Sequence, residues 1–346
     1  MYKHFIRPIL FLIYPETVHH MVVGIIKVFF SVPGIAYLSN SYFKVNHPSL
    51  KRTVFGLEFD NPVGLAAGFD KNASFYNEFS KLGFSFIEIG TVTPRGQSGN
   101  PKPRSFRLPK DKALINRMGF NNLGADEVVK NLKKRKTRII IGGNLGKNTL
   151  TPNNLAVNDY TFTFNKLYDY VDYFVVNVSC PNISDLHELQ DKDSLMEILN
   201  SIMIERSKKQ KEKPILLKIS PDLNFAQIDE VIEIVAETKI DGIVATNTTI
   251  GRYKLSSTEK KIHQIGNGGM SGLPLKDRST EIIKYISTKT AGKIPIIGVG
   301  GIMTPNDALE KLRAGASLVQ VYSGFIYEGP ALVKKINKAI LENQEL

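Results

Sequence analysis

Along most of the chain, short apolar runs rich in β-branched residues alternate with longer segments in which apolar residues recur at helical spacing. A continuous apolar run between turn residues predicts a strand buried on both faces, and the longer pattern predicts an amphipathic helix. About eight such units after residue 54 indicate an α/β protein built as a closed (β/α)8 TIM barrel, not an open doubly wound sheet. The predicted strands are 63–67, 84–90, 139–144, 173–178, 215–219, 242–246, 295–299 and 318–322. The clearest helices are 225–238, 275–290, 305–314 and 331–341.

The beginning of the chain has a different pattern. Two apolar stretches, 5–14 and 21–32, are interrupted by Arg7 and Lys27. Neither reaches the roughly 20 uninterrupted apolar residues of a transmembrane helix, and prolines break the apolar core that a signal peptide needs. We predict a pair of short helices, the second beginning at Pro15, that either pack on the main domain or lie in a membrane interface.

The chain is long enough for one large domain with a small appendage. Residues 34–47 are interpreted as a linker out of the helical pair. This predicts a small N-terminal helical extension, residues 1–45, followed by a barrel domain, residues 46–346.

The formal net charge of +12 is compatible with two kinds of partner, nucleic acid and an anionic membrane surface. The two densest basic runs, 133–136 and 208–211, fall near the ends of helical patterns, where cations suit the helix dipole. Aromatic residues do not interleave with them as in single-strand binders, so we predict no nucleic-acid partner. The single cysteine excludes an intramolecular disulfide.

The predicted strands end in small or hydrogen-bonding residues. In TIM barrels the chemistry gathers at these carboxyl ends, and a purely structural barrel has no need for polar groups there. The two longest connections, 91–122 and 247–273, leave from the same face, as active-site lids do. The strand-end residues are Ala67, Gly68, Lys71, Thr91, Asn144, Asn177, Lys218, Thr246, Asn247, Thr248, Gly301, Tyr322 and Ser323.

The fourth predicted strand runs into the only cysteine, Cys180, between Asn177 and Asn182. Pro181 cannot continue a central strand, so the strand must end by Cys180. The two carboxamides suit a polar, planar ligand. The same sequence is also compatible with a buried structural cysteine beside turn-forming residues. The motif alone does not decide between a ligand site and this structural role.

Glycines follow the seventh predicted strand in 298–302, and small polar residues follow the eighth, where barrels commonly hold a phosphate. Gly272 adds a further backbone donor. No GxGxxG turn follows a first strand, and the histidines and cysteine never fall at metal-ligand spacing, so neither a Rossmann nicotinamide nor a metal is supported. Lys218 would stabilise the negative charge of a reduced flavin, unless it is simply a lysine that snorkels from a strand end.

Several short motifs follow one another along the chain. They are 61–71 (NPVGLAAGFDK), 90–95 (GTVTPR), 99–104 (GNPKPR), 116–122 (NRMGFNN), 144–148 (NLGKN), 177–182 (NVSCPN), 218–222 (KISPD), 247–249 (NTT) and 298–302 (GVGGI). Together these motifs resemble those of the dihydroorotate dehydrogenases of the membrane-associated, quinone-using class. The resemblance extends from Pro15 to the C-terminal helix, and a match over so many spaced motifs is highly specific.

The resemblance implies oxidation of (S)-dihydroorotate to orotate in de novo pyrimidine synthesis, with FMN as hydride acceptor and a quinone as final electron acceptor. It implies that Cys180 is the base that takes a proton from C5, while a hydride leaves C6. It implies that the N-terminal helices form a quinone tunnel, with His19 and Arg107 at the quinone head group. The residues assigned to orotate are Lys71, Asn116, Asn177, Asn182, Asn247 and Thr248. The residues assigned to FMN are Ala67, Gly68, Thr91, Asn144, Asn177, Lys218, Thr246, Gly272, Gly301, Tyr322 and Ser323.

One position departs from that class. The quinone-using enzymes usually have serine as the base, whereas cysteine, as in Cys180, is usual in the soluble class. The N-terminal helices and the blocks 99–104 and 116–122 agree with the quinone class, so we predict a quinone acceptor. The alternatives are a soluble-class enzyme that uses fumarate and, less favoured by the motifs, a basic nucleic-acid-binding barrel. We expect a peripheral, monomeric enzyme at the cytoplasmic face of the cell membrane.

Overall fold

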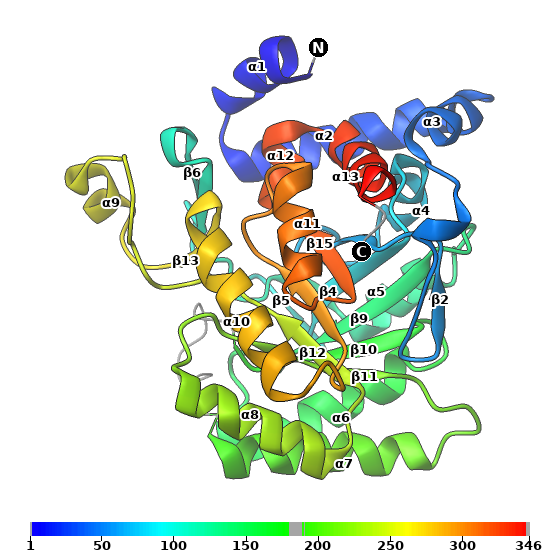
Figure 1. Cartoon of the computed structure of the whole chain (residues 1–346), viewed down its shortest axis with the longest axis vertical. Helices are drawn as coiled ribbons and strands as arrows, with labels where there is room; N and C mark the ends of the chain where they lie inside the picture. Colours follow the sequence, from blue (N-terminus) through cyan, green and yellow to red (C-terminus); the bar gives the residue numbers. More distant parts are fainter. Residues whose placement is uncertain (1, 180–188, 190, 344–346) are drawn as a thin grey trace.

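Eight parallel strands close into a barrel whose strand order around the ring follows the chain (Figure 1). The computed structural model describes residues 2–179, 189 and 191–343. All eight predicted strands are present, which confirms the (β/α)8 barrel, although the second is shifted two residues toward the C-terminus. The barrel strands are β3 (Val63–Leu65), β4 (Phe86–Val92), β9 (Ile140–Leu145), β10 (Tyr173–Asn177), β11 (Ile215–Ile219), β12 (Gly242–Ala245), β14 (Ile296–Val299) and β15 (Leu318–Val321).

Helices connect the strands and cover the outside of the barrel (Figure 1). Their ends follow local signals: Asn224 caps the first turn of α8 through a capping box with Gln227, and Lys239 ends that helix in the left-handed region at φ 57°. The connecting helices are α4 (Tyr76–Phe79), α5 (Ala125–Leu132), α6 (Ala156–Leu167), α7 (Lys192–Ser207), α8 (Phe225–Thr238), α9 (Glu259–Ile265), α10 (Lys276–Lys289), α11 (Pro305–Arg313), α12 (Ser323–Glu328) and α13 (Ala331–Glu342).

The barrel interior is apolar at the amino ends of the strands. A hairpin of β1 (Arg52–Val54) and β2 (Leu57–Phe59) closes this end, and the Phe59 ring lies 5.3 Å from that of Phe86. Side chains from several strands fill the layer above it. Each large apolar side chain buried in this way contributes about 1.5–3 kcal/mol, so this end is a packed plug and the opposite end is free to bind ligands.

The two long connections fold into small antiparallel sheets over the carboxyl ends of the strands. One contains β6 (Ser105–Leu108), β7 (Ala113–Asn116) and β13 (Gly269–Gly272), and the other pairs β5 (Arg95–Gln97) with β8 (Asn122–Gly124). The register of β7 with β13 joins Asn116 to Gly269, so both connections meet over the same barrel end.

The N-terminal helices lie together at one end of the molecule, beside α12 and α13 (Figure 1). They are a π-helix, Tyr2–Ile6, followed by α1 (Arg7–Phe11), α2 (Pro15–Ser31) and α3 (Ile35–Phe43). The predicted helix start at Pro15 is confirmed. The predicted linker at 34–47 is wrong: Gly34, at φ 86°, turns the chain into α3, and Ser39, a loop-like residue, is buried and donates to Lys81 O at 3.2 Å.

A buried ion pair fastens α2 to the sheet above the barrel. Arg104, which immediately precedes β6, donates to Glu16 from Nη2 at 2.7 Å and from Nε at 3.2 Å, and both side chains are buried. The hydroxyl of Tyr14 accepts a hydrogen bond from the backbone N–H of Arg104 at 2.7 Å. Among the described residues no single helix is both long and apolar enough to cross a membrane; α2 and α3 reach that length together but are bent by 111° between them.

Candidate active site

A cavity of about 1030 Å³, open to solvent, lies at the carboxyl ends of the barrel strands. The predicted site residues on its wall are Ala67, Gly68, Lys71, Thr91, Asn116, Asn177, Lys218, Thr246, Asn247, Thr248, Gly272, Gly301, Tyr322 and Ser323. Further lining residues, not singled out from the sequence, include Met118, Phe120, Leu275 and Gln320.

Asn144 is not among the residues that line the cavity. Asn144 is fully buried behind the wall, where its side-chain oxygen accepts hydrogen bonds from Thr91 at 2.5 Å and Asn177 at 3.2 Å. Asn144 therefore acts through these neighbours. Cys180 and Asn182 lie outside the described residues.

Carboxamides and hydroxyls form a linked, uncharged wall on one side of the cavity. Asn177 Nδ2 donates to Thr91 Oγ1 at 3.1 Å, and Asn247 Nδ2 donates to Asn177 Oδ1 at 3.2 Å and Ser179 Oγ at 3.1 Å. Tyr160 holds the end of β10 by donating to Asn177 O at 3.0 Å. The network fixes the orientation of each amide before any ligand arrives, as recognition of a planar, polar ring requires.

A fully buried carboxylate, Glu88, stands inside the barrel beneath this wall. Asn144 Nδ2 donates to one of its oxygens at 2.7 Å, and Gln320 Nε2 donates to the other at 2.6 Å. Lys218 Nζ lies 3.7 Å from the first oxygen. Glu88 was not anticipated, although a lone acidic residue in the apolar run of β4 signals a buried charge that needs partners.

Lys218, the penultimate residue of β11, places a positive charge in the cavity wall beside Glu88. Its side chain is 7% exposed, and within the described part of the chain its ammonium has no partner besides Glu88. The ammonium therefore keeps hydrogen-bond donors for a ligand in the cavity. The strand is fixed beside β10 by the Ser179 hydroxyl, which donates to Lys218 O at 2.9 Å.

The opposite side of the cavity is built from backbone. Gly301, at φ 71°, lies so close to α10 that a Cβ there would be 2.3 Å from Lys276 Cα. Its N–H meets no acceptor among the described residues, and Ser323 and Gly324 are the first residues of α12, whose N–H groups have no intrahelical acceptor. Several unused donors without a side chain between them suit an oxyanion such as a phosphate.

Lys71 and Asn116, two of the residues predicted to bind the substrate, lie where the cavity meets the small antiparallel sheets. Lys71 donates to Asn121 Oδ1, and Asn116 Nδ2 donates to Gly269 O at 3.3 Å. These contacts tie the wall of the cavity to the antiparallel sheets above it.

The predicted quinone residues do not line this cavity: His19 belongs to α2, and Arg107 belongs to β6 and contacts the N-terminal helices. The His19 ring contacts Phe69 at 5.2 Å, and burial lowers the pKa of His19 to about 4, with the charges of His20 and Lys71 acting in the same direction. Phe69 also touches Tyr322 of the cavity wall at 5.3 Å, so a continuous aromatic path leads from His19 to the cavity.

Arg107 contacts the N-terminal helices at α1 and at the turn that follows it. Its guanidinium lies 4.6 Å from the Phe11 ring and donates to Ile13 O at 2.6 Å. Burial lowers the pKa of Arg107, although a guanidinium remains charged at any physiological pH.

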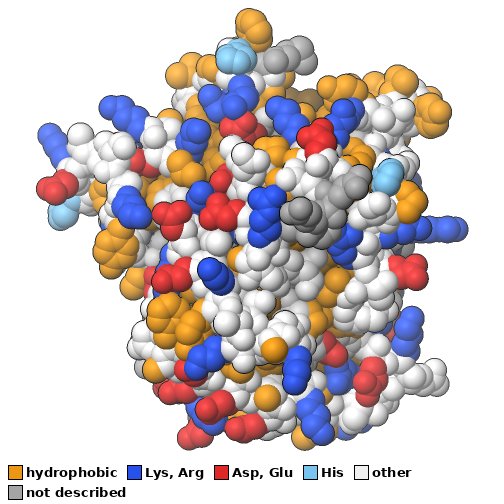
Figure 2. Space-filling view, in the orientation of Figure 1, with side chains coloured by type: hydrophobic (Ala, Val, Ile, Leu, Met, Phe, Trp, Pro, Cys, Tyr) orange, Lys and Arg blue, Asp and Glu red, His pale blue; other side chains and the backbone are white. Residues whose placement is uncertain are grey.

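Large apolar side chains are exposed on the outer faces of the N-terminal helices (Figure 2). Gathered exposed apolar side chains are typical of surfaces that contact a partner or a membrane. We call it the N-terminal apolar patch. Its members are Phe5, Ile9, Leu12, Ile25, Val28, Phe29, Tyr37, Leu38 and Tyr42.

The described residues contain no group of three or more His, Cys, Asp or Glu side chains that could hold a metal ion.

Comparison with known proteins gives a consistent result. Residues 49–343 match the family model for dihydroorotate dehydrogenase. The chain is 56% identical over 342 residues to a dihydroorotate dehydrogenase (quinone) from Christiangramia forsetii, covering 99% of each chain. It is 48% identical over 330 residues to one from Gloeobacter violaceus, covering 95% of this chain and 91% of that one. A crystal structure of the Eimeria tenella enzyme in complex with ferulenol superposes with a TM-score of 0.83 at 37% identity, covering 96% of this chain and 92% of that one.

Proposed function

Because the chain belongs to the dihydroorotate dehydrogenase family, we propose that it oxidises (S)-dihydroorotate to orotate, with bound FMN and a quinone as final electron acceptor. The reaction removes a proton from C5 and a hydride from C6, and the two electrons and two protons end on the quinone. The observation that carries the proposal is the cavity itself, where a cation, an amide wall and a cluster of free backbone donors face one space.

The donors of the cavity fit FMN. The N–H groups around Gly301 and Ser323 would hold its phosphate, and Lys218 would lie at the part of the ring that gains negative charge. When bound, FMN would supply the acceptor for the C6 hydride and pass the electrons to quinone. The chain itself contributes position and charge: Glu88 and Asn144 hold Lys218 and Asn177 in place.

The amide wall would bind the substrate. Asn177 and Asn247 are oriented by each other, and Asn116 and Thr248 line the same cavity. Neutral amides can match both the N–H and C=O groups of a dihydroorotate ring, and Lys71 would supply a positive charge for its carboxylate.

Cys180 is proposed as the base on the strength of the motif at 177–182. A thiol titrates near 8.5, so a modest shift of its pKa provides thiolate at neutral pH. The neighbouring Ser179 hydroxyl is less suited to the task, because it donates to Lys218 O and accepts from Asn247.

The N-terminal helices would receive the quinone at the membrane surface. The N-terminal apolar patch would enter the interfacial region, and His19 and Arg107 would meet the quinone head group beside the aromatic path to the cavity. The positive net charge favours an anionic leaflet, which supports binding at the cytoplasmic face.

The test uses the purified full-length protein. We expect a yellow protein whose flavin absorbance is bleached by dihydroorotate without oxygen, and restored by a short-chain ubiquinone or menaquinone but not by fumarate. Restoration by fumarate alone would assign the chain to the soluble-class activity that a cysteine base suggests. A colourless protein that does not take up FMN would refute the proposed function.

A further inference from the structure

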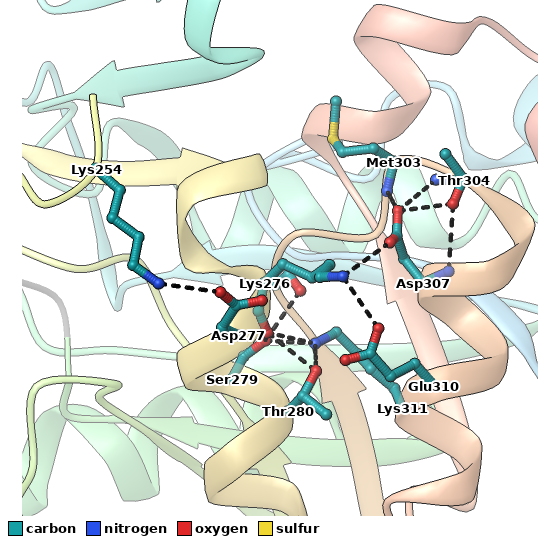
Figure 3. Close-up of polar contacts among 11 residues, drawn as sticks. Lys254, Lys276, Asp277, Ser279, Thr280, Met303, Thr304, Asp307, Glu310 and Lys311 are labelled. Carbon is teal, nitrogen blue, oxygen red and sulfur yellow. Dashed lines mark hydrogen bonds and ion pairs between the residues drawn. The ribbon is translucent and has the colours of Figure 1, made fainter. Parts of the chain in front are cut away.

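Lys311, on α11, is completely buried between α10 and α11 (Figure 3). Its ammonium donates to Ser279 Oγ, to Thr280 Oγ1 at 3.0 Å and to Lys276 O at 3.4 Å. All three acceptors are neutral. A buried ammonium without a carboxylate partner is costly.

The nearest carboxylates are engaged by another lysine. Lys276 Nζ lies 3.1 Å from Glu310 Oε2 and 3.6 Å from Asp307 Oδ1, and Asp277 pairs with Lys254 at 3.3 Å (Figure 3). In the described part of the chain no ion pair involves Lys311. The positive charge of Lys311 is therefore not neutralised by a direct ion pair.

A single hydroxyl connects Lys311 with the cavity. Ser279 Oγ, which accepts from Lys311, lies 2.9 Å from Gly300 O and 3.1 Å from Lys276 O, and its one proton is shared between these two acceptors. A Cβ on Gly300 would lie 2.9 Å from the same oxygen, so the turn rests directly on Ser279. The other face of this turn, at Gly300 and Gly301, lines the cavity.

We propose that Lys311 is a positioning residue for the FMN phosphate: it orders the Gly300–Gly301 turn through Ser279 and supplies positive charge from behind it. The inference rests on the proposed FMN site. A phosphate on the cavity side of the turn would add a negative charge to those of Glu310, Asp307 and Asp277, none of which forms an ion pair with Lys311 within the described residues.

The arrangement makes FMN affinity depend on pH. Burial lowers the pKa of Lys311 to about 7, against the charges of Glu310 and Asp307, while Lys276 lowers it further and Asp277 raises it. The hydrogen bond and charge of Glu310 raise the pKa of Lys276, which stays protonated in this range. A phosphate keeps two charges above about pH 6, so FMN should bind tightest between about pH 6 and 7 and more weakly as Lys311 deprotonates.

The test measures FMN binding to apoprotein by quenching of flavin fluorescence, in wild type, Lys311→Met and Lys284→Met. Lys284 is an exposed lysine of α10, so its variant matches the change in net charge. We expect Lys311→Met to raise the Kd for FMN at least about tenfold at pH 7 and to abolish the weakening between pH 7 and 9. Riboflavin, which lacks the phosphate, should bind wild type and Lys311→Met equally.

Equal FMN affinity and equal pH profiles in Lys311→Met and Lys284→Met would overturn the inference while leaving the proposed function intact. A wild-type apoprotein that does not bind FMN would overturn both. If Lys311→Met does not fold, calorimetry of the wild type decides: binding of FMN at pH 8 in buffers of different ionisation enthalpy should take up protons. Absence of proton uptake would contradict the inference.

Discussion

Lys218 Nζ lies 3.7 Å from Glu88 Oε1, and both side chains are buried where the barrel opens into the cavity. The pair joins two environments. Glu88 belongs to the barrel interior and is held by Asn144 and Gln320, whereas Lys218 faces the cavity. The charge that the cavity presents to a bound flavin is therefore that of Lys218 reduced by Glu88.

Replacing Glu88 with Gln would leave the charge of Lys218 unopposed. The reduced, more negative flavin would then be stabilised, so we expect the midpoint potential of bound FMN to rise by roughly 30 mV or more, equivalent to about 1.4 kcal/mol for two electrons. A redox titration against reference dyes measures the shift. Glu58→Gln, at an exposed site on β2, is the control. A potential that does not move would show that the Glu88 charge is not felt in the cavity.

The Glu16–Arg104 pair predicts how the N-terminal helices are held. Breaking a buried pair costs about 3–5 kcal/mol because the remaining charge loses its partner. We expect Glu16→Ala to expose α2 to limited proteolysis and to slow quinone turnover, while dihydroorotate still bleaches the flavin at the normal rate. Lys102→Ala should have little effect, because Lys102 is exposed and lies 3.8 Å from Glu16.

The double variant Glu16→Met, Arg104→Leu extends the test. It removes both charges, so protection against proteolysis should largely return. If Glu16→Ala lowers flavin reduction as strongly as quinone turnover, the pair stabilises the whole barrel and not only the docking of α2.

The barrel strands could be predicted because parallel strands are buried on both faces and read as unbroken apolar runs. Lys218 was found for the same reason: a charge at the end of such a run must face something polar. Other features were out of reach. The pairing of Asn116 with Gly269 joins residues 153 positions apart, and no local pattern specifies it. The helix α3 was missed because Ser39 looks like a loop residue until its burial against Lys81 is seen.

For Glu88, the sequence predicts burial but does not identify the partners of the carboxylate. Its position within β4 indicates burial, but which side chains satisfy it depends on how the strands are placed around the barrel. Lys311 is similar, since its helical spacing looks amphipathic and only the packing of α10 against α11 shows that its acceptors are neutral. Packing between distant elements decides both cases.

His19 gives a prediction about acid. Burial lowers the pKa of His19 to about 4 from about 6.5 in an unfolded chain, so its neutral form is the one that fits the folded protein. Its contribution to stability is complete above pH 6.5 and is lost as the pH falls toward 4. We expect His19→Phe to lose less stability than wild type over this interval, by roughly 2–4 kcal/mol at about 1.4 kcal/mol per pKa unit.

Thermal unfolding between pH 4 and 7 measures the His19 effect, and His20→Phe is the matched control because His20 is the exposed neighbour on α2. In the same variants, quinone reduction should suffer in His19→Phe only. Parallel pH profiles for His19→Phe and wild type would mean that the imidazole is protonated without cost.

Cys180 provides the sharpest test of the chemistry, since it is the residue in which the chain departs from the quinone-using pattern. We expect Cys180→Ala to bind FMN normally but to reduce it at least about 100-fold more slowly, the usual consequence of losing a general base. Cys180→Ser should retain part of the rate and keep accelerating with pH where wild type levels off, which we expect below the free-thiol pKa of about 8.5, because a hydroxyl is far harder to deprotonate. Anaerobic stopped-flow mixing with dihydroorotate from pH 6 to 10 measures both, with Ser179→Ala as comparison. Near-normal reduction in Cys180→Ala, or a greater loss in Ser179→Ala, would transfer the role of base to another residue.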